Sequence, residues 1–177
     1  MEILIFSDSH GRIDGMMRAI DAQIKRPDLI LHLGDGVREV DFLRERGIPV
    51  VAVRGNCDLF GPSSEYGESF CLEELGHKIF MTHGHRFGVK SGVGGIASHA
   101  AQIGADIVLF GHTHRPLEQR IDAGYEIGGV TLTRPMYLFN PGSIGSGRTG
   151  GDSLSFGTLS LTKTHVFFSH GAASIKK

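Results

Sequence analysis

The chain has 177 residues, of which 40% are hydrophobic and 21% are charged, and its formal net charge is −1. This balance is typical of a globular domain with a substantial core, and it lacks the basic excess that duplex nucleic acid usually recruits. Two cysteines exclude a disulfide framework, and no apolar run approaches the roughly 18 residues that span a bilayer. The opening MEILIFSDSH also lacks the features of a signal peptide. We therefore expect a single domain over residues 1–177, with a frayed tail at about 171–177, in a reducing cytoplasm without a membrane partner.

The first part of the chain alternates short apolar runs with amphipathic repeats. The apolar runs predict three buried strands, at residues 3–6, 29–33 and 50–53. Between them, apolar residues at three- and four-residue steps predict two helices, one from Ile13 to Ile24 that ends near Pro27, and one from Val37 to Leu43 that Gly47 stops. This order predicts parallel strands joined by right-handed crossovers.

The second part of the chain is richer in predicted strands. After a loop at 61–67, two strands at 70–75 and 78–82 flank a turn at Gly76-His77, followed by a helix at 96–103 and a buried strand at 107–110. Short β segments follow at 117–121, 125–127, 130–132, 136–139, 153–161 and 165–168, and we expect Gly142 to Gly151 to form a long hairpin loop. The two parts together predict an α/β fold, a four-layer α/β/β/α sandwich of two packed mixed β-sheets flanked by helices.

Polar side chains follow five of the predicted buried strands, within a few residues of the last apolar residue. They are Asp8, His10, Asp35, Asn56, His83, His112 and His114. Ligands bind at the carboxyl ends of strands in open α/β sheets, so these side chains are expected to converge. Carboxylate, imidazole and amide donors without thiolate suit manganese, iron, zinc or nickel.

Seven donors are too many for one tetrahedral metal, and they fit two metals bridged by a carboxylate, roughly 3.5 to 4 Å apart. Simpler readings exist for single residues, since a histidine after a strand is often a turn or surface residue and Asp35 could be a helix N-cap. A structural zinc site is the other alternative, but such sites favour cysteine, and neither cysteine lies in a CxxC pair. The two-metal interpretation explains all five strand ends at once.

An ordered set of short motifs carries these donors. The set is Asp8-Ser9-His10, Gly34-Asp35, Gly55-Asn56-Cys57-Asp58, His83-Gly84-His85 and Gly111-His112-Thr113-His114. It resembles the motifs of the calcineurin-like metallophosphoesterases, and in particular those of their small bacterial and archaeal phosphodiesterase branch. The segment Asn140-Pro141-Gly142-Ser143 also resembles a late turn of that branch.

The resemblance implies a role for each donor. Asp8, His10 and His114 would hold one metal, Asn56, His83 and His112 a second, and Asp35 would bridge the two. It also implies a hydrolase in which a metal-bound hydroxide attacks phosphorus in line. We expect two divalent ions, manganese first, with nickel, zinc and iron as alternatives.

Three further residues bear on the substrate. This chain has Cys57 at a position where many members of the larger superfamily have a histidine, which is thought to protonate the leaving alcohol. A thiol, with a reference pKa of about 8.5, is a poorer acid near pH 7. We expect His85 to be the substitute acid or a phosphate donor, or else to support the metal ligands by a hydrogen bond. His85 and Asn56 are therefore the expected catalytic residues, and Arg54 is expected to contact substrate, or else to form a surface ion pair.

Several other polar residues have simpler expected roles. Asp58 is expected to organise its loop or to cap the turn that follows, and His32 to be a core histidine with a hydrogen-bond partner. We expect His77, His99, His165 and His170 on the surface or in turns.

The sequence thus predicts a phosphodiesterase that hydrolyses small or nucleotide-like phosphodiesters. A phosphomonoesterase is the alternative enzyme, and a non-catalytic, retromer-subunit-like protein-binding scaffold is the alternative of a different class. A nuclease is less consistent with a short chain that lacks an evident basic groove. The expected partner is a small-molecule phosphoester, without a strong nucleic-acid signal, and a homo-oligomer is compatible with the sequence.

Overall fold

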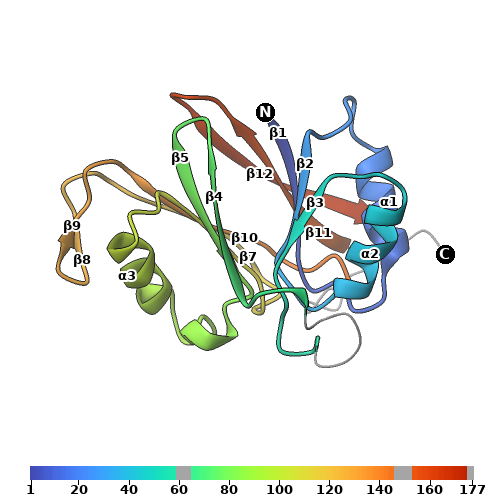
Figure 1. Ribbon diagram of the computed structural model, residues 1–177, viewed down its shortest axis with the longest axis horizontal. Helices are drawn as coiled ribbons and strands as arrows, with labels where there is room; N and C mark the ends of the chain where they lie inside the picture. Colours follow the sequence, from blue (N-terminus) through green and yellow to red (C-terminus); the bar gives the residue numbers. More distant parts are fainter. Residues whose placement is uncertain (59–64, 146–152, 175–177) are drawn as a thin grey trace.

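A computed structural model describes residues 1–58, 65–145 and 153–174, and its main elements are two five-stranded sheets (Figure 1). The first sheet has the order β12-β11-β1-β2-β3, and its strands in chain order are β1 (Glu2–Phe6), β2 (Leu29–His32), β3 (Val50–Ala52), β11 (Ser153–Leu161) and β12 (Val166–Ser174). The second sheet has the order β4-β5-β6-β10-β7, with β4 (Ser69–Glu74), β5 (His77–Thr82), β6 (Ile107–Phe110), β7 (Pro116–Ile121) and β10 (Met136–Pro141).

Helices cover the outer face of each sheet, as Figure 1 shows. The helices α1 (Ile13–Asp21) and α2 (Val37–Glu45) lie on the first sheet, and α3 (Gly94–Gln102) lies on the second. A short arm of β8 (Glu126–Ile127) and β9 (Val130–Thr131) packs against the α3 side, and the short 3₁₀ helix η2 (His85–Phe87) follows β5.

Three apolar clusters fill the three interfaces between these layers. The cluster between the helices α1 and α2 and the first sheet includes Leu4, Phe6, Met16 and Val40. The cluster between the two sheets includes Ile5, Leu31, Met81 and Leu109. The cluster beneath α3 includes Phe80, Ile96, Val108 and Phe110. Successive residues of one strand thus belong to different clusters, because side chains alternate between the two faces of a sheet. The predicted four-layer α/β/β/α sandwich is confirmed.

Both sheets are mixed, and their central strands are parallel. Within the first sheet, β1, β2 and β3 are parallel, with Phe6 opposite His32 and His32 opposite Ala52. Within the second, β5 and β6 are parallel, with Thr82 opposite Phe110. The loops that follow these five strands therefore leave the sheets at matched levels, which is the arrangement that the strand-end donors require.

The predicted hairpin loop at Gly142 to Gly151 is wrong in its topology. β10 lies in the second sheet beside β6 and β7, whereas β11 lies in the first sheet between β1 and β12, so this connection crosses from one sheet to the other. Residues 146–152 lie outside the described part of the chain. β12 is also longer than predicted, because it runs to Ser174 and so includes part of the expected tail.

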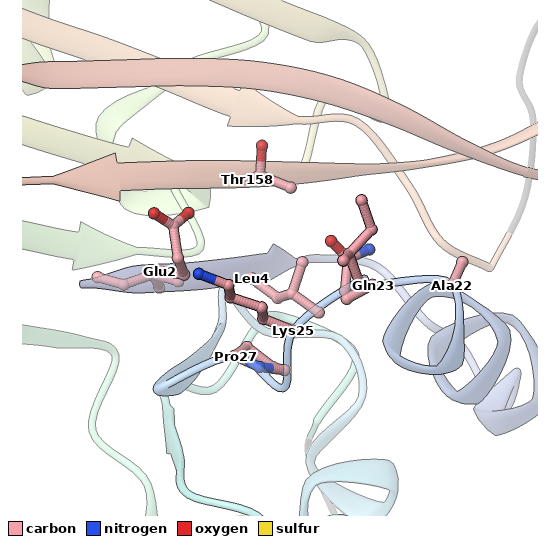
Figure 2. A pocket seen from close by; sticks show the side chains of 9 residues that line it. Glu2, Leu4, Ala22, Gln23, Lys25, Pro27 and Thr158 are labelled. Atoms are coloured by element: carbon pink, nitrogen blue, oxygen red, sulfur yellow. The ribbon is translucent and has the colours of Figure 1, made fainter.

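The first predicted helix is shorter than expected. α1 ends at Asp21, and Ile24 is fully exposed, so its apolar side chain does not continue the buried face. Ile24 instead lines a surface hollow of 470 Å³ beside the first residues of β1 (Figure 2). This hollow lies at the end of β1 opposite Asp8 and contains none of the seven predicted ligands.

The expectation that His77 lies on the surface or in a turn is wrong. His77 begins β5 and is buried, its Nδ1 lies 2.7 Å from Asp106 Oδ2, and its Nε2 donates to the carbonyl of Thr162 at 3.1 Å. Arg134 also donates to Asp106 at 2.9 Å. The turn comprises Leu75 and Gly76 instead, both with positive φ. His99 differs as well, since it lies on α3, half-buried, with its ring against those of Phe80 and Phe87.

Within residues 1–58, 65–145 and 153–174, no helix is long and apolar enough to cross a membrane.

Candidate metal centre

The backbone at the predicted ligands adopts a conformation that non-glycine residues rarely take. Six non-glycine residues in the described ranges have positive φ, and five of them are predicted ligands: Asp8 (55°), His10 (45°), Asp35 (57°), His112 (66°) and His114 (57°). Each such conformation costs on the order of 1 to 3 kcal/mol and persists where the surrounding structure enforces it. This clustering of left-handed residues at one edge of both sheets marks the edge as a functional site.

Asp8, His10 and His114 form one group of side chains whose ligand atoms lie within 4.8 Å of one another. His114 Nε2 is 3.0 Å from Asp8 Oδ1, and His10 Nε2 is 3.9 Å from the same oxygen. The two imidazole Nε2 atoms are 3.4 Å apart. One carboxylate and two imidazoles from the loops after β1 and β6 therefore converge on a single point.

Asp35 and His83 form a second group with Asp8. His83 Nε2 lies 3.3 Å from Asp35 Oδ2 and 3.9 Å from Asp8 Oδ1. Asp35 Oδ2 also lies 4.0 Å from His10 Nε2, so this carboxylate stands between the two groups.

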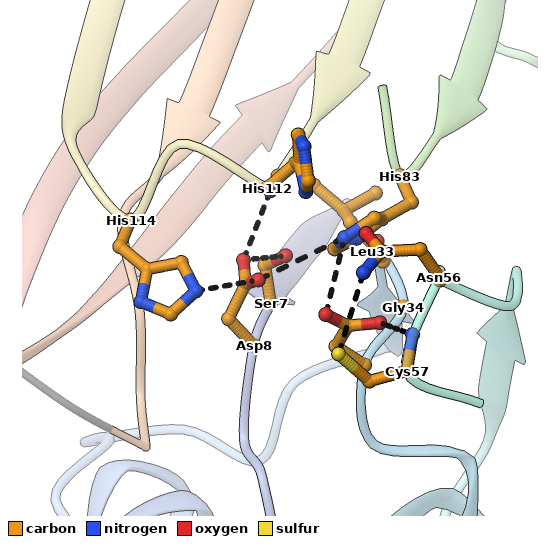
Figure 3. A network of polar contacts seen from close by, with 12 residues as sticks. Ser7, Asp8, Leu33, Gly34, Asn56, Cys57, His83, His112 and His114 are labelled. Carbon is orange, nitrogen blue, oxygen red and sulfur yellow. Dashed lines mark hydrogen bonds and ion pairs between the residues drawn. The ribbon is translucent and has the colours of Figure 1, made fainter. Parts of the chain in front are cut away.

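His112 and Asn56 lie beside His83 (Figure 3), although neither belongs to these groups. The ring of His112 is centred 5.0 Å from that of His83. Asn56 is exposed, and its side-chain amide donates to Cys57 Sγ at 3.4 Å. All seven predicted ligands thus come to the same edge of the two sheets.

Hydrogen bonds orient the buried ligands. Asp8 Oδ2 accepts from the Ser7 hydroxyl at 2.6 Å and from the His112 backbone N–H at 3.1 Å (Figure 3). Asp35 Oδ1 accepts from the Cys57 backbone N–H at 2.7 Å. His83 Nδ1 donates to the carbonyl of Leu33 at 2.8 Å, and in the neutral ring this leaves the lone pair on Nε2.

Asp8 Oδ1 and His83 Nε2 lie at the middle of this network. Both atoms are buried, and their polar neighbours are other donors of the cluster, with His114 Nε2 3.0 Å from Asp8 Oδ1 and Asp35 Oδ2 3.3 Å from His83 Nε2. A carboxylate oxygen and an imidazole nitrogen are both good ligands for a divalent cation, and here several of them face one another in a buried site. The donor set therefore fits bound metal.

The charge states of the cluster also suit a cation. Burial would raise the pKa of Asp8, but hydrogen bonds and positive charge from His114, His83 and Ser7 outweigh burial and lower it. The pKa of Asp35 is lowered as well, since the hydrogen bond and charge of His83 and the Cys57 N–H outweigh its burial. Burial, His83 and Lys90 lower the pKa of His112 to about 4. Near pH 7 both carboxylates are ionised and His112 is neutral, which are the forms that bind metal.

Asp58 and His32 join the ligand loops to one another. Asp58 accepts four backbone N–H bonds of 2.7 to 3.2 Å, from Asp35, Gly36, Val37 and Gly55, which confirms its predicted role in organising the loop. His32 is fully buried, accepts from the Gly34 N–H at 3.2 Å, and lies 3.1 Å from the Ser9 hydroxyl. The predicted core histidine with a partner is therefore confirmed, and its partners lie in the loops that carry Asp8, His10 and Asp35.

The turn that starts at Asn140 supports the opposite side of the cluster. Asn140 is buried and donates to the carbonyl of Gly111 at 2.9 Å and to the hydroxyl of Thr113 at 3.1 Å. Ser143 donates its hydroxyl to the carbonyl of Asp8 at 2.9 Å. The motif Asn140-Pro141-Gly142-Ser143 was visible in the sequence, but its contacts to both ligand loops depend on the crossing between the sheets.

Ser7 and Glu39 are site residues that sequence reasoning missed. The Ser7 hydroxyl binds Asp8, and the carboxylate of buried Glu39 accepts the backbone N–H of Gly11, next to His10. Ser7 directly precedes a predicted ligand, which was a usable signal, whereas nothing in the sequence places Glu39 of α2 beside Gly11.

The three residues expected near the substrate occupy the rim of the site. Arg54 Nη2 lies 3.4 Å from Glu68 Oε1, which is the ion pair considered as its alternative role. His85 Nδ1 is buried without a partner in the described ranges, and burial and the charge of His83 lower the pKa of His85. Cys57 Sγ is within 4.8 Å of ligand atoms of His10 and Asp35, but burial and Asp35 raise the pKa of the thiol to about 11.

Comparison with known proteins gives one consistent picture. Residues 1–164 match the calcineurin-like phosphoesterase superfamily domain. The chain is 32% identical over 144 residues to the probable metallophosphoesterase YsnB of Bacillus subtilis, covering 81% of this chain and 75% of YsnB. It is 30% identical over 184 residues to the phosphodiesterase YfcE of Escherichia coli, covering 90% of this chain and 87% of YfcE.

Solved structures show the same architecture. A predicted phosphoesterase of Streptococcus pneumoniae superposes with a TM-score of 0.68 at 24% identity and covers 97% of both chains. Vps29 of Entamoeba histolytica, solved in complex with zinc, superposes with a TM-score of 0.71 at 22% identity, covering 97% of this chain and 92% of Vps29. At these identities the likeness establishes the fold.

Proposed function

This chain belongs to the calcineurin-like phosphoesterase superfamily, and on that premise we propose that it is a two-metal phosphodiesterase that hydrolyses small or nucleotide-like phosphodiesters. The observation that carries the proposal is the convergence of carboxylates and imidazoles from both sheets around the buried atoms Asp8 Oδ1 and His83 Nε2. The name of the relative YfcE, a phosphodiesterase, supports a diester substrate.

In this proposal Asp8, His10 and His114 hold one divalent ion, and Asn56, His83 and His112 hold the other. Asp35 bridges them, which its position within 3.3 Å of His83 Nε2 and 4.0 Å of His10 Nε2 supports. Manganese is the expected metal, with nickel, zinc or iron as substitutes, because the donors are oxygen and imidazole nitrogen. Cys57 is not assigned as a ligand, although its Sγ lies within 4.8 Å of ligand atoms of His10 and Asp35, because the seven oxygen and nitrogen donors already supply the proposed set.

Two bound divalent ions supply Lewis-acid chemistry, in that they lower the pKa of water and stabilise negative charge on phosphoryl oxygens. The residues of the chain orient this chemistry. Ser7, Leu33 and the Cys57 N–H fix Asp8, His83 and Asp35 through hydrogen bonds of 2.6 to 2.8 Å. Such fixed donors need little reorganisation during the reaction.

The leaving group receives little help from Cys57, whose pKa of about 11 makes it a weak proton donor. The lowered pKa of His85 leaves a neutral imidazole near pH 7, which favours a hydrogen bond to a phosphoryl oxygen over donation of a proton. Diesters with acidic leaving groups, such as aryl diesters, are therefore expected to be the best artificial substrates.

The bridging role of Asp35 can be tested by Asp35→Asn. We expect the variant to bind fewer than two metals and to lose activity on an aryl phosphodiester by at least about 100-fold, since even outer-shell changes at metal sites cost 10- to 100-fold. Metal content and turnover are measured on the same preparation. Asp122→Asn is the matched control, because Asp122 is an exposed carboxylate paired with Arg120. Full activity and two metals in Asp35→Asn would rule out the assignment.

The substrate class can be tested with matched aryl mono- and diesters and protein loaded with each metal in turn. A diesterase has the larger kcat/KM on the diester, and the reverse order would identify a monoesterase. If metal-loaded protein hydrolyses neither ester, the proposal is overturned and the protein-binding scaffold becomes the remaining function. The likeness to Vps29, at 22% identity, concerns the fold and does not itself support that function.

A further inference from the structure

A hollow of 340 Å³ opens directly beside the centre on the side of Asn56 and His85. Two arginines line it, Arg54 from the loop after β3 and Arg86 from η2, together with Glu68. Because Asn56 is a proposed ligand, a group in this hollow would be adjacent to the reacting phosphate. The hollow is therefore placed to receive a part of the substrate that is not hydrolysed.

Glu68 holds both arginines. Arg86 forms a bidentate pair with it, with Nε 3.1 Å from Oε2 and Nη2 3.0 Å from Oε1. Arg54 Nη2 lies 3.4 Å from the same Oε1. This paired geometry is the one in which guanidinium groups recognise carboxylate and phosphate in ligands.

The backbone around Glu68 is fixed, so this side chain is held at the rim. The backbone N–H of Arg54 donates to the carbonyl of Gly67 at 2.9 Å, and the hydroxyl of Thr82 donates to the carbonyl of Glu68 at 2.8 Å. Nearby Tyr66 is buried and accepts from Arg44 at 2.6 Å. The segment before β4 is thus anchored to the ends of β3 and β5.

Glu68 is the acid in this hollow that is available to the arginines. Asp58 also lines the hollow, but its oxygens already accept four backbone N–H bonds. The side chains of Arg86, Arg54 and Glu68 are 68%, 39% and 34% exposed, so an incoming anion can reach the guanidinium groups. An exposed ion pair contributes little stability, and a ligand can replace it at small cost.

We propose that this hollow binds a second anionic group of the substrate, a phosphate or carboxylate remote from the ester that is hydrolysed, and that Glu68 occupies the place of this group in the free protein. Arg86 and Arg54 pair with the second anion when substrate binds. This inference rests on the proposed phosphodiesterase function and adds that the preferred diester carries at least one further negative charge.

Two substrates with the same leaving group test the inference, ethyl p-nitrophenyl phosphate and 2-carboxyethyl p-nitrophenyl phosphate, at fixed ionic strength. The protein should hydrolyse the carboxyethyl ester with a lower KM, by about tenfold, because one charge-assisted contact is gained. If neither ester is hydrolysed, the phosphodiesterase proposal itself fails. If both are hydrolysed with equal KM, only the anion site is overturned.

Two variants at the hollow should act in opposite directions. Arg86→Gln should abolish the preference for the carboxyethyl ester, because it raises the KM of that ester about tenfold and affects the ethyl ester much less. Glu68→Gln should increase that preference several-fold, because it removes the competing carboxylate. Arg120→Gln is the matched control, since Arg120 forms an exposed pair with Asp122 at 2.9 Å outside this hollow. Equal effects of Arg86→Gln on both esters, or a loss of preference in Glu68→Gln, would contradict the proposal.

Discussion

At the scale of single residues, His83 couples the centre to pH. Burial alone would lower the pKa of His83, but Asp35 and Asp8 outweigh burial and raise the pKa above its ordinary value. A proton on His83 Nε2 must leave before a metal binds there, so binding competes with protonation.

We therefore expect the affinity for manganese to rise with pH from the ordinary histidine range upward, by up to about tenfold per unit while His83 is protonated. Titration calorimetry of metal-free protein, in two buffers with different ionisation enthalpies, measures both the affinity and the protons released. A release of no protons near pH 6 would contradict this assignment. Metal affinity rises with pH because the protonated His83 ring stabilises the metal-free form at low pH and loses its proton as the pH increases.

His32 is expected to position the two loops that its ring joins. In the neutral ring Nδ1 accepts from Gly34, so Nε2 carries the hydrogen and donates to Ser9. His32→Leu should lower the free energy of unfolding by about 2 kcal/mol and weaken metal binding by about 10-fold or more.

His77→Leu is the control for this prediction, since His77 is also buried with two bonds, to Asp106 and Thr162. It should destabilise the protein to a similar extent but leave metal affinity unchanged. Chemical unfolding and metal titration on both variants separate the two effects, and equal metal affinity in both would make the role of His32 merely structural.

The sequence predicted the positions of individual site residues correctly where the signal lay in neighbouring residues of the chain. The ligands stand in short motifs directly after strands, and His32 is flanked by leucines, so their placement followed from pattern alone. His77 was misassigned because its partners, Asp106 and Thr162, are 29 and 85 positions away and only the assembled sheets bring them together.

At the scale of elements, the strand-end loops pack too closely for side chains at certain glycines. A Cβ on Gly55 would lie 2.0 Å from Asp35 Oδ1 and 2.6 Å from the Asp35 backbone nitrogen. The backbone of Gly55, in the loop after β3, therefore contacts Asp35 in the loop after β2 with no room for a side chain. This contact helps to place the proposed bridging carboxylate of Asp35.

Gly55→Ala should consequently displace Asp35, destabilise the fold by about 1 to 3 kcal/mol and weaken metal binding. Gly94→Ala is the control, because a Cβ on Gly94 at the start of α3 meets nothing within 4 Å. Thermal unfolding with and without manganese measures both effects, and a metal response in Gly55→Ala equal to that of the natural chain would contradict the expected displacement.

Element boundaries were predicted well where periodicity is strong and poorly where an end depends on tertiary packing. The strands at 107–110 and 153–161 occur as expected. α1 stops at Asp21 although Ile24 continues the apolar spacing, because no neighbouring layer covers that position and Ile24 stays exposed. The step from β10 to β11 was read as a hairpin because sequence spacing does not reveal which sheet a strand joins.

At the scale of the whole molecule, the centre joins the two sheets. Asp8, His10, Asp35 and Asn56 follow strands of the first sheet, whereas His83, His112 and His114 follow strands of the second. Between the sheets the interface is otherwise apolar, with Ile5, Leu31, Met81 and Leu109 in its core. Bound metals would therefore act as cross-links at one end of this interface.

Metal loading should accordingly stabilise the whole domain. A ligand present at 100 times its dissociation constant adds about 2.7 kcal/mol per site, and each kcal/mol raises the melting temperature by about 2 to 4 °C for a chain of this size. We expect an increase of about 5 to 10 °C on saturation of one site and a larger increase when both sites fill. Calorimetric scans at increasing manganese concentration measure the increase, and Asp35→Asn should lose most of it because both proposed sites share that carboxylate. A melting temperature independent of metal in the natural chain would show that the ions do not bridge the sheets.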